Sequence, residues 1–190
     1  MKTKMLVGLD EVGRGSWAGP LVVAAVAGSN LSANLNDSKK LTFLQRKKID
    51  ILIRQSTSYI SIIQISNDVL DEVGLTKTIS LAMHQAVKGL NLPDSSQIIV
   101  DGNYNFLNDL PNTTAIVKAD TKVSEVMAAS IVAKVFRDNL MIKYSRKYPG
   151  YAFETNFGYG TREHQDGIRL NGICKLHRLS FKPIQLMSLK

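Results

Sequence analysis

The sequence predicts an α/β fold with a mixed sheet, because strand-like segments come first and then alternate with helical ones. Residues 5–9 and 21–27 are short apolar runs that we expect to form strands. Residues 59–66, which read YISIIQIS, alternate in the manner of a half-buried strand. Two later runs, QIIVDG and TAIVKAD, are also short and apolar, and each leads to an aspartate.

Helical spacing predicts the elements between and after these strands. Residues 42–56 form the first, with Leu44, Ile49, Leu52 and Ile53 as its expected apolar face. Ser66 and Asn67 are candidate N-caps of a short helix, and residues 76–90 and 124–148 predict two longer ones. The alanine-rich first half of the segment at 124–148 is expected to pack centrally. The tail from 151 onward is predicted to be loop-rich, with one helix at about 161–170.

Length and composition set limits on the class of protein. The 190 residues suit a single domain, which we expect to span 1–190 and to include a basic helical region at about 140–190. No apolar run approaches the roughly 20 residues that span a bilayer, and the chain begins without the pattern of a signal peptide. Cys174 is the single cysteine, which excludes an intramolecular disulfide. We therefore expect a cytoplasmic protein.

The positive charge is concentrated in the last third of the chain. Residues 134–190 carry 11 Lys/Arg and 4 Asp/Glu, a net charge of +7, whereas residues 1–133 carry 13 and 12, a net charge of +1. Aromatic residues are interleaved with this basic segment. Such a mixture suits a nucleic acid, and a solvated basic surface that serves solubility is the alternative.

Four acids follow or interrupt the predicted strands. Asp10 and Glu11 end LVGLDE, Asp101 ends QIIVD, and Asp120 ends AIVKAD. One aspartate at a strand end is ordinary turn chemistry, but the repetition points to a site assembled at one edge of a sheet. Carboxylates without a neighbouring cysteine or histidine favour Mg²⁺ or Mn²⁺ over zinc. Two such ions about 4 Å apart suit phosphoryl transfer.

Five motifs carry a resemblance to a known family. The words GLDEVGRGSWAGPLVVAAV, NDSKKL, IIVDGN, KADTKVSEVMAASIVAKVFRD and NFGYGTREHQDGIRLNGICKLHRLSF occur in this order between Met5 and Phe181. In this order they resemble ribonuclease HII, the type 2 ribonucleases H. The resemblance implies a ribonuclease H-like fold with a mixed five-stranded sheet flanked by helices and a C-terminal helical region.

The same resemblance implies an activity and a set of site residues. Family members cut the RNA strand of RNA–DNA hybrids, and they also cut on the 5′ side of single ribonucleotides embedded in duplex DNA. The cut leaves a 3′-hydroxyl and a 5′-phosphate. The resemblance therefore also implies a role in ribonucleotide excision repair. It implies that the four acids are the catalytic ligands of a two-metal Mg²⁺ or Mn²⁺ site. Residues implied to contact substrate are Gly13, Arg14 and Gly15 at the ribose, Ser38 and Lys39 at the nucleic-acid backbone, and Tyr159 at the neighbouring deoxyribose.

Some features qualify the resemblance or leave alternatives. The family commonly has glycine where this chain has Ala119, which bears on the placement of Asp120. The C-terminal segment lacks an aromatic-rich motif that docks on a sliding clamp, and we expect a monomer. The alternatives are a ribonuclease HIII-like hybrid nuclease, where lysine is usual in place of Arg14, and a non-catalytic nucleic-acid-binding module. A phosphate-loop reading of GLDEVGRG is disfavoured by its acids.

Overall fold

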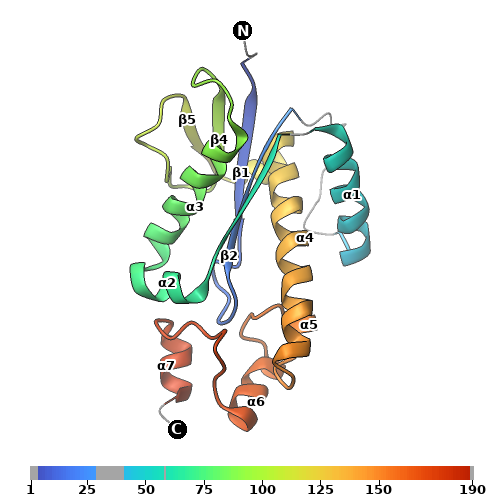
Figure 1. The fold of residues 1–190 in the computed structure, drawn as a ribbon, viewed down its shortest axis with the longest axis vertical. Coiled ribbons are helices and arrows are strands. Elements are labelled where there is room, and N and C mark those ends of the chain that lie inside the picture. The colour runs from blue at the N-terminus through green and yellow to red at the C-terminus, as the bar shows by residue number, and fades with distance from the viewer. Residues whose placement is uncertain (1–3, 29–40, 58, 189–190) are drawn as a thin grey trace. The chain divides into compact units, whose positions relative to one another are not determined.

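The structure is a computed structural model that describes residues 4–28, 41–57 and 59–188. Its five strands are β1 (Leu6–Val12), β2 (Leu21–Ala27), β3 (Ile60–Ile65), β4 (Gln97–Asp101) and β5 (Thr113–Ile116). They form one sheet in the order β3-β2-β1-β4-β5 (Figure 1). β1 is antiparallel to β2 and parallel to β4, and β4 is parallel to β5. The predicted mixed five-stranded sheet is thereby confirmed.

Seven α-helices are described around and after the sheet. They are α1 (Phe43–Ser56), α2 (Asn67–Val73), α3 (Leu75–Leu90), α4 (Ser124–Lys147), α5 (Phe153–Asn156), α6 (Arg162–Asn171) and α7 (Lys182–Ser188). Side-chain oxygens of Thr42, Ser66 and Thr161 accept N-terminal amides of α1, α2 and α6, which fixes where these helices begin. The helices expected from periodicity are therefore present, and α5 and α7 are additional to them.

The expected apolar face of α1 is partly wrong. Ile49 and Ile53 are buried, but Leu44 and Leu52 are 69% and 56% exposed. Five positions along a helix turn the side chain by about 140°, so Leu44 lies on the face opposite Ile49. The buried side of the helix takes in Asp50 instead, whose carboxylate accepts a hydrogen bond from Arg54 Nε at 2.9 Å.

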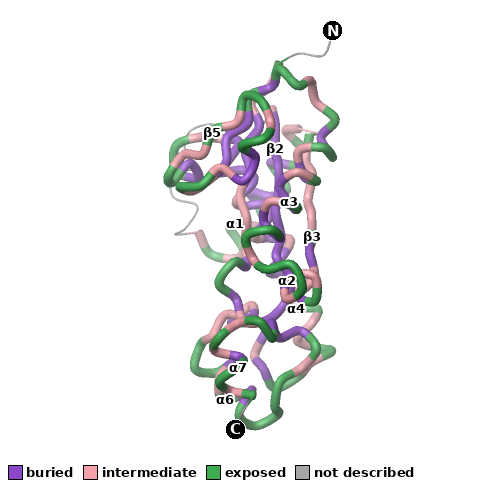
Figure 2. The backbone as a smooth tube through the Cα atoms, turned by 90° about the vertical axis from the view of Figure 1, so that its left-hand side faces the viewer, coloured by how far each residue is buried: buried purple, intermediate pink, exposed green. Residues whose placement is uncertain are grey.

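The core of the sheet lies along β2 and the first half of α4. Every residue of β2 is buried, as Figure 2 shows by its purple colour. The buried residues of α4 include Val126, Ala129 and Val132, so the expectation that its alanine-rich half packs centrally is confirmed. Among the described residues, none of the helices has the length and apolar character needed to cross a membrane.

The chain divides into two compact units. Unit 1 comprises residues 1–12, 22–63 and 79–135, and unit 2 comprises residues 13–21, 64–78 and 136–190. Unit 1 contains most of the sheet and the first half of α4. Unit 2 has its own apolar cluster, which includes Met141, Phe153, Ile168 and Ile184. The sequence crosses from one unit to the other directly after β1, between Val12 and Gly13.

Candidate active site

The registers of β1 and β4 place Asp10 and Asp101 at the same level of two neighbouring strands. The two strands are parallel, and Leu9 lies opposite Val100. The next residue of each strand is an aspartate, and Asp101 is also the last residue of β4. The carboxyl ends of parallel strands are where sites assemble in α/β sheets. The predicted convergence is therefore present for this pair.

The strand that leads to Asp120 is shorter than the sequence indicates. β5 ends at Ile116, and Asp120 lies in a 3₁₀ helix (Ala119–Thr121) that follows Lys118, a residue in the left-handed region with φ 57°. The Asp101 Oδ1 atom accepts the Ala119 amide at 2.7 Å and the Asp120 amide at 3.4 Å. These bonds turn the chain out of the strand and tie the Asp120 segment to the end of β4.

Ala119 fits this turn without strain. Its φ is not positive, so the position does not require glycine. The residue is fully buried and belongs to an apolar cluster with Ile99 and Val126. Its methyl group is therefore part of the packing that supports Asp120.

The Asp10 carboxyl group accepts hydrogen bonds from two donors and lies near two other acids. The Glu11 amide donates to Asp10 Oδ1 at 2.8 Å, and the Ser130 hydroxyl, on α4, donates to the same carboxyl group. Burial raises the pKa of Asp10 to about 8, and the charges of Glu11 and Asp101 act in the same direction. Sequence reasoning missed Ser130, whose signal is a lone hydroxyl within the apolar stretch VMAASIVA.

The donor chemistry of the four carboxylates fits Mg²⁺ or Mn²⁺, which prefer oxygen ligands. One carboxylate oxygen of Glu11 and one of Asp120 are closed off from solvent. Within the described part of the chain, however, no three Asp, Glu, His or Cys side chains are grouped as ready-made metal ligands. The four acids therefore lie in neighbouring segments, but their carboxylates are not already arranged as a metal-binding site.

The predicted ribose-contacting segment belongs to unit 2. Gly13 has φ 87°, and a Cβ built there would overlap Arg137 Nε, so both backbone and packing require glycine. The side chain of Arg14 is exposed. A Cβ built on Gly15 would meet nothing within 4 Å. Of the other predicted positions, Ser38 and Lys39 lie outside the described residues.

Tyr159 is fixed through its main chain, also in unit 2. Its amide donates to Asn156 O at 2.9 Å, and its carbonyl accepts from His164 Nδ1 at 2.9 Å. His164 Nε2 lies 3.1 Å from His177 Nε2, and His177 Nδ1 accepts the Cys174 amide at 2.8 Å. This network assigns the Nδ1–H tautomer to His164 and the Nε2–H tautomer to His177. Both rings are buried.

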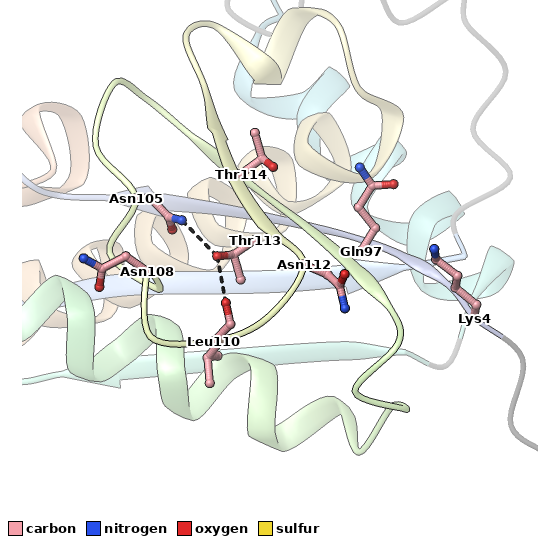
Figure 3. A pocket seen from close by; sticks show the side chains of 8 residues that line it. All are labelled: Lys4, Gln97, Asn105, Asn108, Leu110, Asn112, Thr113 and Thr114. Carbon is pink, nitrogen blue, oxygen red and sulfur yellow. Dashed lines mark hydrogen bonds between the residues drawn. The ribbon is translucent and has the colours of Figure 1, made fainter.

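A separate polar pocket of about 520 Å³ lies at the opposite ends of β4 and β5 (Figure 3). Gln97 and Thr113, the first residues of these strands, are among its lining residues. The others are Lys4, Asn105, Asn108, Leu110, Asn112 and Thr114. The pocket has no carboxylate and lies at the other end of the strands from Asp101.

Comparison with known proteins gives matches over nearly the whole chain. The family model described as Ribonuclease HII matches residues 7–184. A ribonuclease HII of Borrelia duttonii is 40% identical over 183 residues, covering 95% of this chain and all of that protein.

Two solved structures show the same fold. The ribonuclease HII in a PCNA complex from Archaeoglobus fulgidus has a TM-score of 0.82 at 25% identity, with 98% of each chain covered. A Bst-RNase HIII in complex with Mn²⁺ has a TM-score of 0.71 at 21% identity, covering 99% of this chain and 70% of that one. The second of these matches bears on the fold alone, whereas the family match extends over nearly the whole chain. The chain therefore belongs to the ribonuclease HII family, the metal-dependent endoribonucleases that act on RNA–DNA hybrids.

Proposed function

We propose that this chain cuts the phosphodiester bond on the 5′ side of a ribonucleotide, both in RNA–DNA hybrids and at single ribonucleotides within duplex DNA. In this hydrolysis, water adds to the phosphorus while the bond to the 3′-oxygen of the preceding nucleotide breaks. The products are a 3′-hydroxyl and a 5′-phosphate. The observation that carries the proposal is the placement of Asp10 and Asp101 on adjacent parallel strands, with Asp101 also bound to the Asp120 turn.

Asp10, Glu11, Asp101 and Asp120 are the proposed ligands of two Mg²⁺ or Mn²⁺ ions. Held by these carboxylates, such ions would activate a water molecule for attack and would stabilise the charge on the leaving oxygen. The protein's part is to hold the carboxylates ready. The Ser130 hydroxyl and Glu11 amide orient Asp10, and the Asp101 carboxylate sets the position of the Asp120 turn.

Selection of the ribonucleotide is assigned to unit 2. Gly13, Arg14 and Gly15 are proposed to contact the ribose 2′-hydroxyl through main-chain groups, since this hydroxyl distinguishes RNA from DNA locally. Tyr159 is proposed to pack on the deoxyribose that follows, and Ser38 and Lys39 to contact the backbone. The open space around Gly15 supports this assignment.

The test is a nicking assay on duplex DNA that contains one ribonucleotide, with Mg²⁺ or Mn²⁺ added. We expect one nick on the 5′ side of the ribonucleotide and none in the all-DNA duplex. Asp101→Asn removes the nick, whereas Asp94→Asn, at an exposed position before β4, retains it. An absence of cleavage with either metal overturns the proposal and favours a non-catalytic nucleic-acid-binding module. Cleavage confined to long hybrids favours a ribonuclease HIII-like activity.

The remaining proposals concern the state of the protein. We propose that the protein is a monomer and that it works in the cytoplasm. Its single cysteine suits a reducing compartment. The Archaeoglobus relative is seen with PCNA. Size-exclusion chromatography with light scattering tests the monomer directly.

A further inference from the structure

Two arginines in unit 2, Arg137 and Arg178, have no exposed surface at all. A charged guanidinium is costly to bury unless its donors are satisfied. Burial lowers the pKa of Arg178 to about 9, with Arg137 acting in the same direction, and it also lowers the pKa of Arg137. Both side chains hydrogen-bond to the segment that follows β1. Their placement therefore needs an explanation in terms of that segment.

Arg137 donates hydrogen bonds to three residues of the segment that follows β1 and to one residue of a second segment. Its Nε donates to Pro20 O at 2.9 Å, and its Nη2 donates to Ala18 O at 3.0 Å and to Ser16 Oγ at 2.7 Å. Its Nη1 donates to Phe157 O at 2.8 Å. One side chain thus joins the segment after β1 to the segment that contains Tyr159.

The guanidinium of Arg137 also lies against two residues of the proposed recognition surface. It occupies the space where a Cβ of Gly13 would stand. Its Cζ lies 5.6 Å from the centre of the Tyr159 ring. A planar, five-donor group fits these contacts, whereas a lysine ammonium has neither the shape nor the donors.

Arg178 fixes the peptide groups closest to the proposed ribose contact. Its Nε donates to Gly19 O at 3.0 Å and its Nη1 donates to Arg14 O at 3.1 Å. In a trans peptide the C=O and N–H bonds point in opposite directions, and the described residues contain no cis peptide. Because Arg14 O is turned to Arg178, the Gly15 N–H is turned away from it.

The preceding peptide is fixed in the same way. The Ser16 hydroxyl donates to Gly13 O at 2.9 Å and accepts from Arg137. With Gly13 O turned to Ser16, the Arg14 N–H points in the opposite direction. Two successive amides thereby have set directions, and both carbonyls of the pair are held by buried groups.

We propose that Arg137 and Arg178 are positioning residues for ribonucleotide recognition, because they orient the Arg14 and Gly15 amides toward the ribose and hold the Tyr159 segment beside them. This inference rests on the proposed function. Neither arginine touches the substrate. Both act through the main-chain carbonyls that they bind, so that the amides are set before a ribonucleotide arrives and less ordering is needed on binding.

The experiment compares Arg178→Lys and Arg137→Lys with Ile184→Ala, which shortens a buried side chain in the apolar cluster of unit 2 that takes part in none of these hydrogen bonds. Each is tested for thermal unfolding, for kcat/KM on the single-ribonucleotide duplex, and for ribose preference. Ribose preference is the ratio of Kd for all-DNA duplex to Kd for the ribonucleotide duplex, measured in an Asp120→Asn background that prevents cutting.

We expect each lysine variant to lower the ribose preference by about tenfold, the equivalent of one lost hydrogen bond, with little change in Kd for all-DNA duplex. Ile184→Ala lowers the unfolding temperature but keeps the preference. A lysine variant that unfolds at or above the temperature of Ile184→Ala and keeps the wild-type preference overturns the inference. Failure of the wild type itself to prefer or cut the ribonucleotide duplex overturns the proposed function instead.

Ser16→Ala gives a second, milder test. It removes the hydroxyl that links Gly13 O to Arg137 and leaves both arginines in place. We expect a severalfold loss of ribose preference, in the same direction as the lysine variants. An unchanged preference in a folded Ser16→Ala protein contradicts the proposed positioning, even where the arginine variants do not fold.

Discussion

Gly8 of β1 lies directly against the backbone of Val126 in the first turn of α4. A Cβ built on Gly8 would overlap the Val126 nitrogen and the carbonyl carbon of Glu125. Both neighbours are main-chain atoms, so no side chain can rotate to make room. This contact holds α4 close to the strand that carries Asp10, two residues further on, and α4 in turn supplies the Ser130 hydroxyl to that carboxyl group.

Gly8→Ala is expected to destabilise the protein by about 1–3 kcal/mol, the usual cost of overpacking a close contact. Nicking activity should fall as well, since moving α4 away from β1 also moves Ser130 from Asp10. Urea unfolding measures the first effect and kcat the second. Gly15→Ala is the matched control for stability, because a Cβ there meets no atom. Equal stability of Gly8→Ala and the wild type contradicts the contact.

Gly15→Ala is itself expected to separate stability from recognition. Its φ is not positive and the surrounding space is open, so the unfolding temperature should match that of the wild type. The added methyl stands beside the amide proposed to meet the 2′-hydroxyl, and kcat/KM on the single-ribonucleotide duplex should fall at least tenfold. Wild-type cleavage by this variant removes Gly15 from the proposed recognition surface.

Gly13→Ala is expected to lower both the unfolding temperature and the nicking activity. The position has φ 87° and its Cβ would overlap Arg137 Nε, so the substitution strains the backbone and displaces a buried guanidinium. Thermal unfolding and the nicking assay should both show a loss. A Gly13→Ala protein as stable as Gly15→Ala shows that Arg137 is free to move.

The sequence predicted the sheet and most helices because their signals are local. Thr42, Ser66 and Thr161 each cap the helix that follows, and the apolar run of β2 is buried at every residue. Leu44 was misplaced because helical spacing permits several faces, and tertiary packing selects the one around Ile49.

The site was predictable in its acids but not in its supports. Asp10 and Asp101 each follow an apolar run, which is a visible pattern, although β1 continues past Asp10 to Val12 and only Asp101 ends its strand. Ser130, by contrast, reaches Asp10 from a helix far along the chain. The 3₁₀ turn at Asp120 depends on a long-range bond to Asp101. In the sequence, Arg137 and Arg178 look like surface arginines of the basic segment. Only the fold shows that they are buried.

Acid is expected to destabilise unit 2 through its buried histidines. Burial lowers the pKa of His177 to about 4, with repulsion from His164 adding to it, and burial also lowers the pKa of His164. The unfolded histidines take up protons near pH 6.5, so the unfolded chain binds more protons than the folded one below that pH. The stability present above pH 6.5 is therefore lost as the pH falls toward 4.

The free energy of unfolding, measured from pH 4 to 7 with urea, checks this dependence. His177→Gln should reduce the slope of the unfolding free energy against pH. The reduction is up to about 1.4 kcal/mol per pH unit, which corresponds to one proton. His84→Gln is the control, since this residue belongs to unit 1 and is paired with Asp109 on the surface. A His177→Gln slope equal to that of the wild type excludes His177 as the source.

Asp10 is expected to make the metal-free protein less stable in base. Burial, Glu11 and Asp101 raise the pKa of Asp10 from 3.8 to about 8, so the unfolded carboxyl loses its proton well before the folded one does. Between these values the folded state binds more protons, and the contribution of Asp10 to stability declines as the pH rises from 3.8 through 8. Asp10→Asn keeps an acceptor for the Glu11 amide without the charge. In EDTA at pH 8.5, its unfolding temperature should exceed that of the wild type.

If the four carboxylates bind divalent cations, adding these cations should make the unfolding temperature of the wild type higher than that of Asp10→Asn. Mg²⁺ or Mn²⁺ lowers the repulsion among the acids and binds only the folded site, which raises the unfolding temperature of the wild type in proportion to the logarithm of its concentration. Asp10→Asn, with one ligand changed, should show a smaller rise and no nicking. Asp94→Asn should behave as the wild type does. An equal rise in the wild type and Asp10→Asn would place the cations elsewhere on the protein, because a site that does not involve Asp10 is indifferent to its charge.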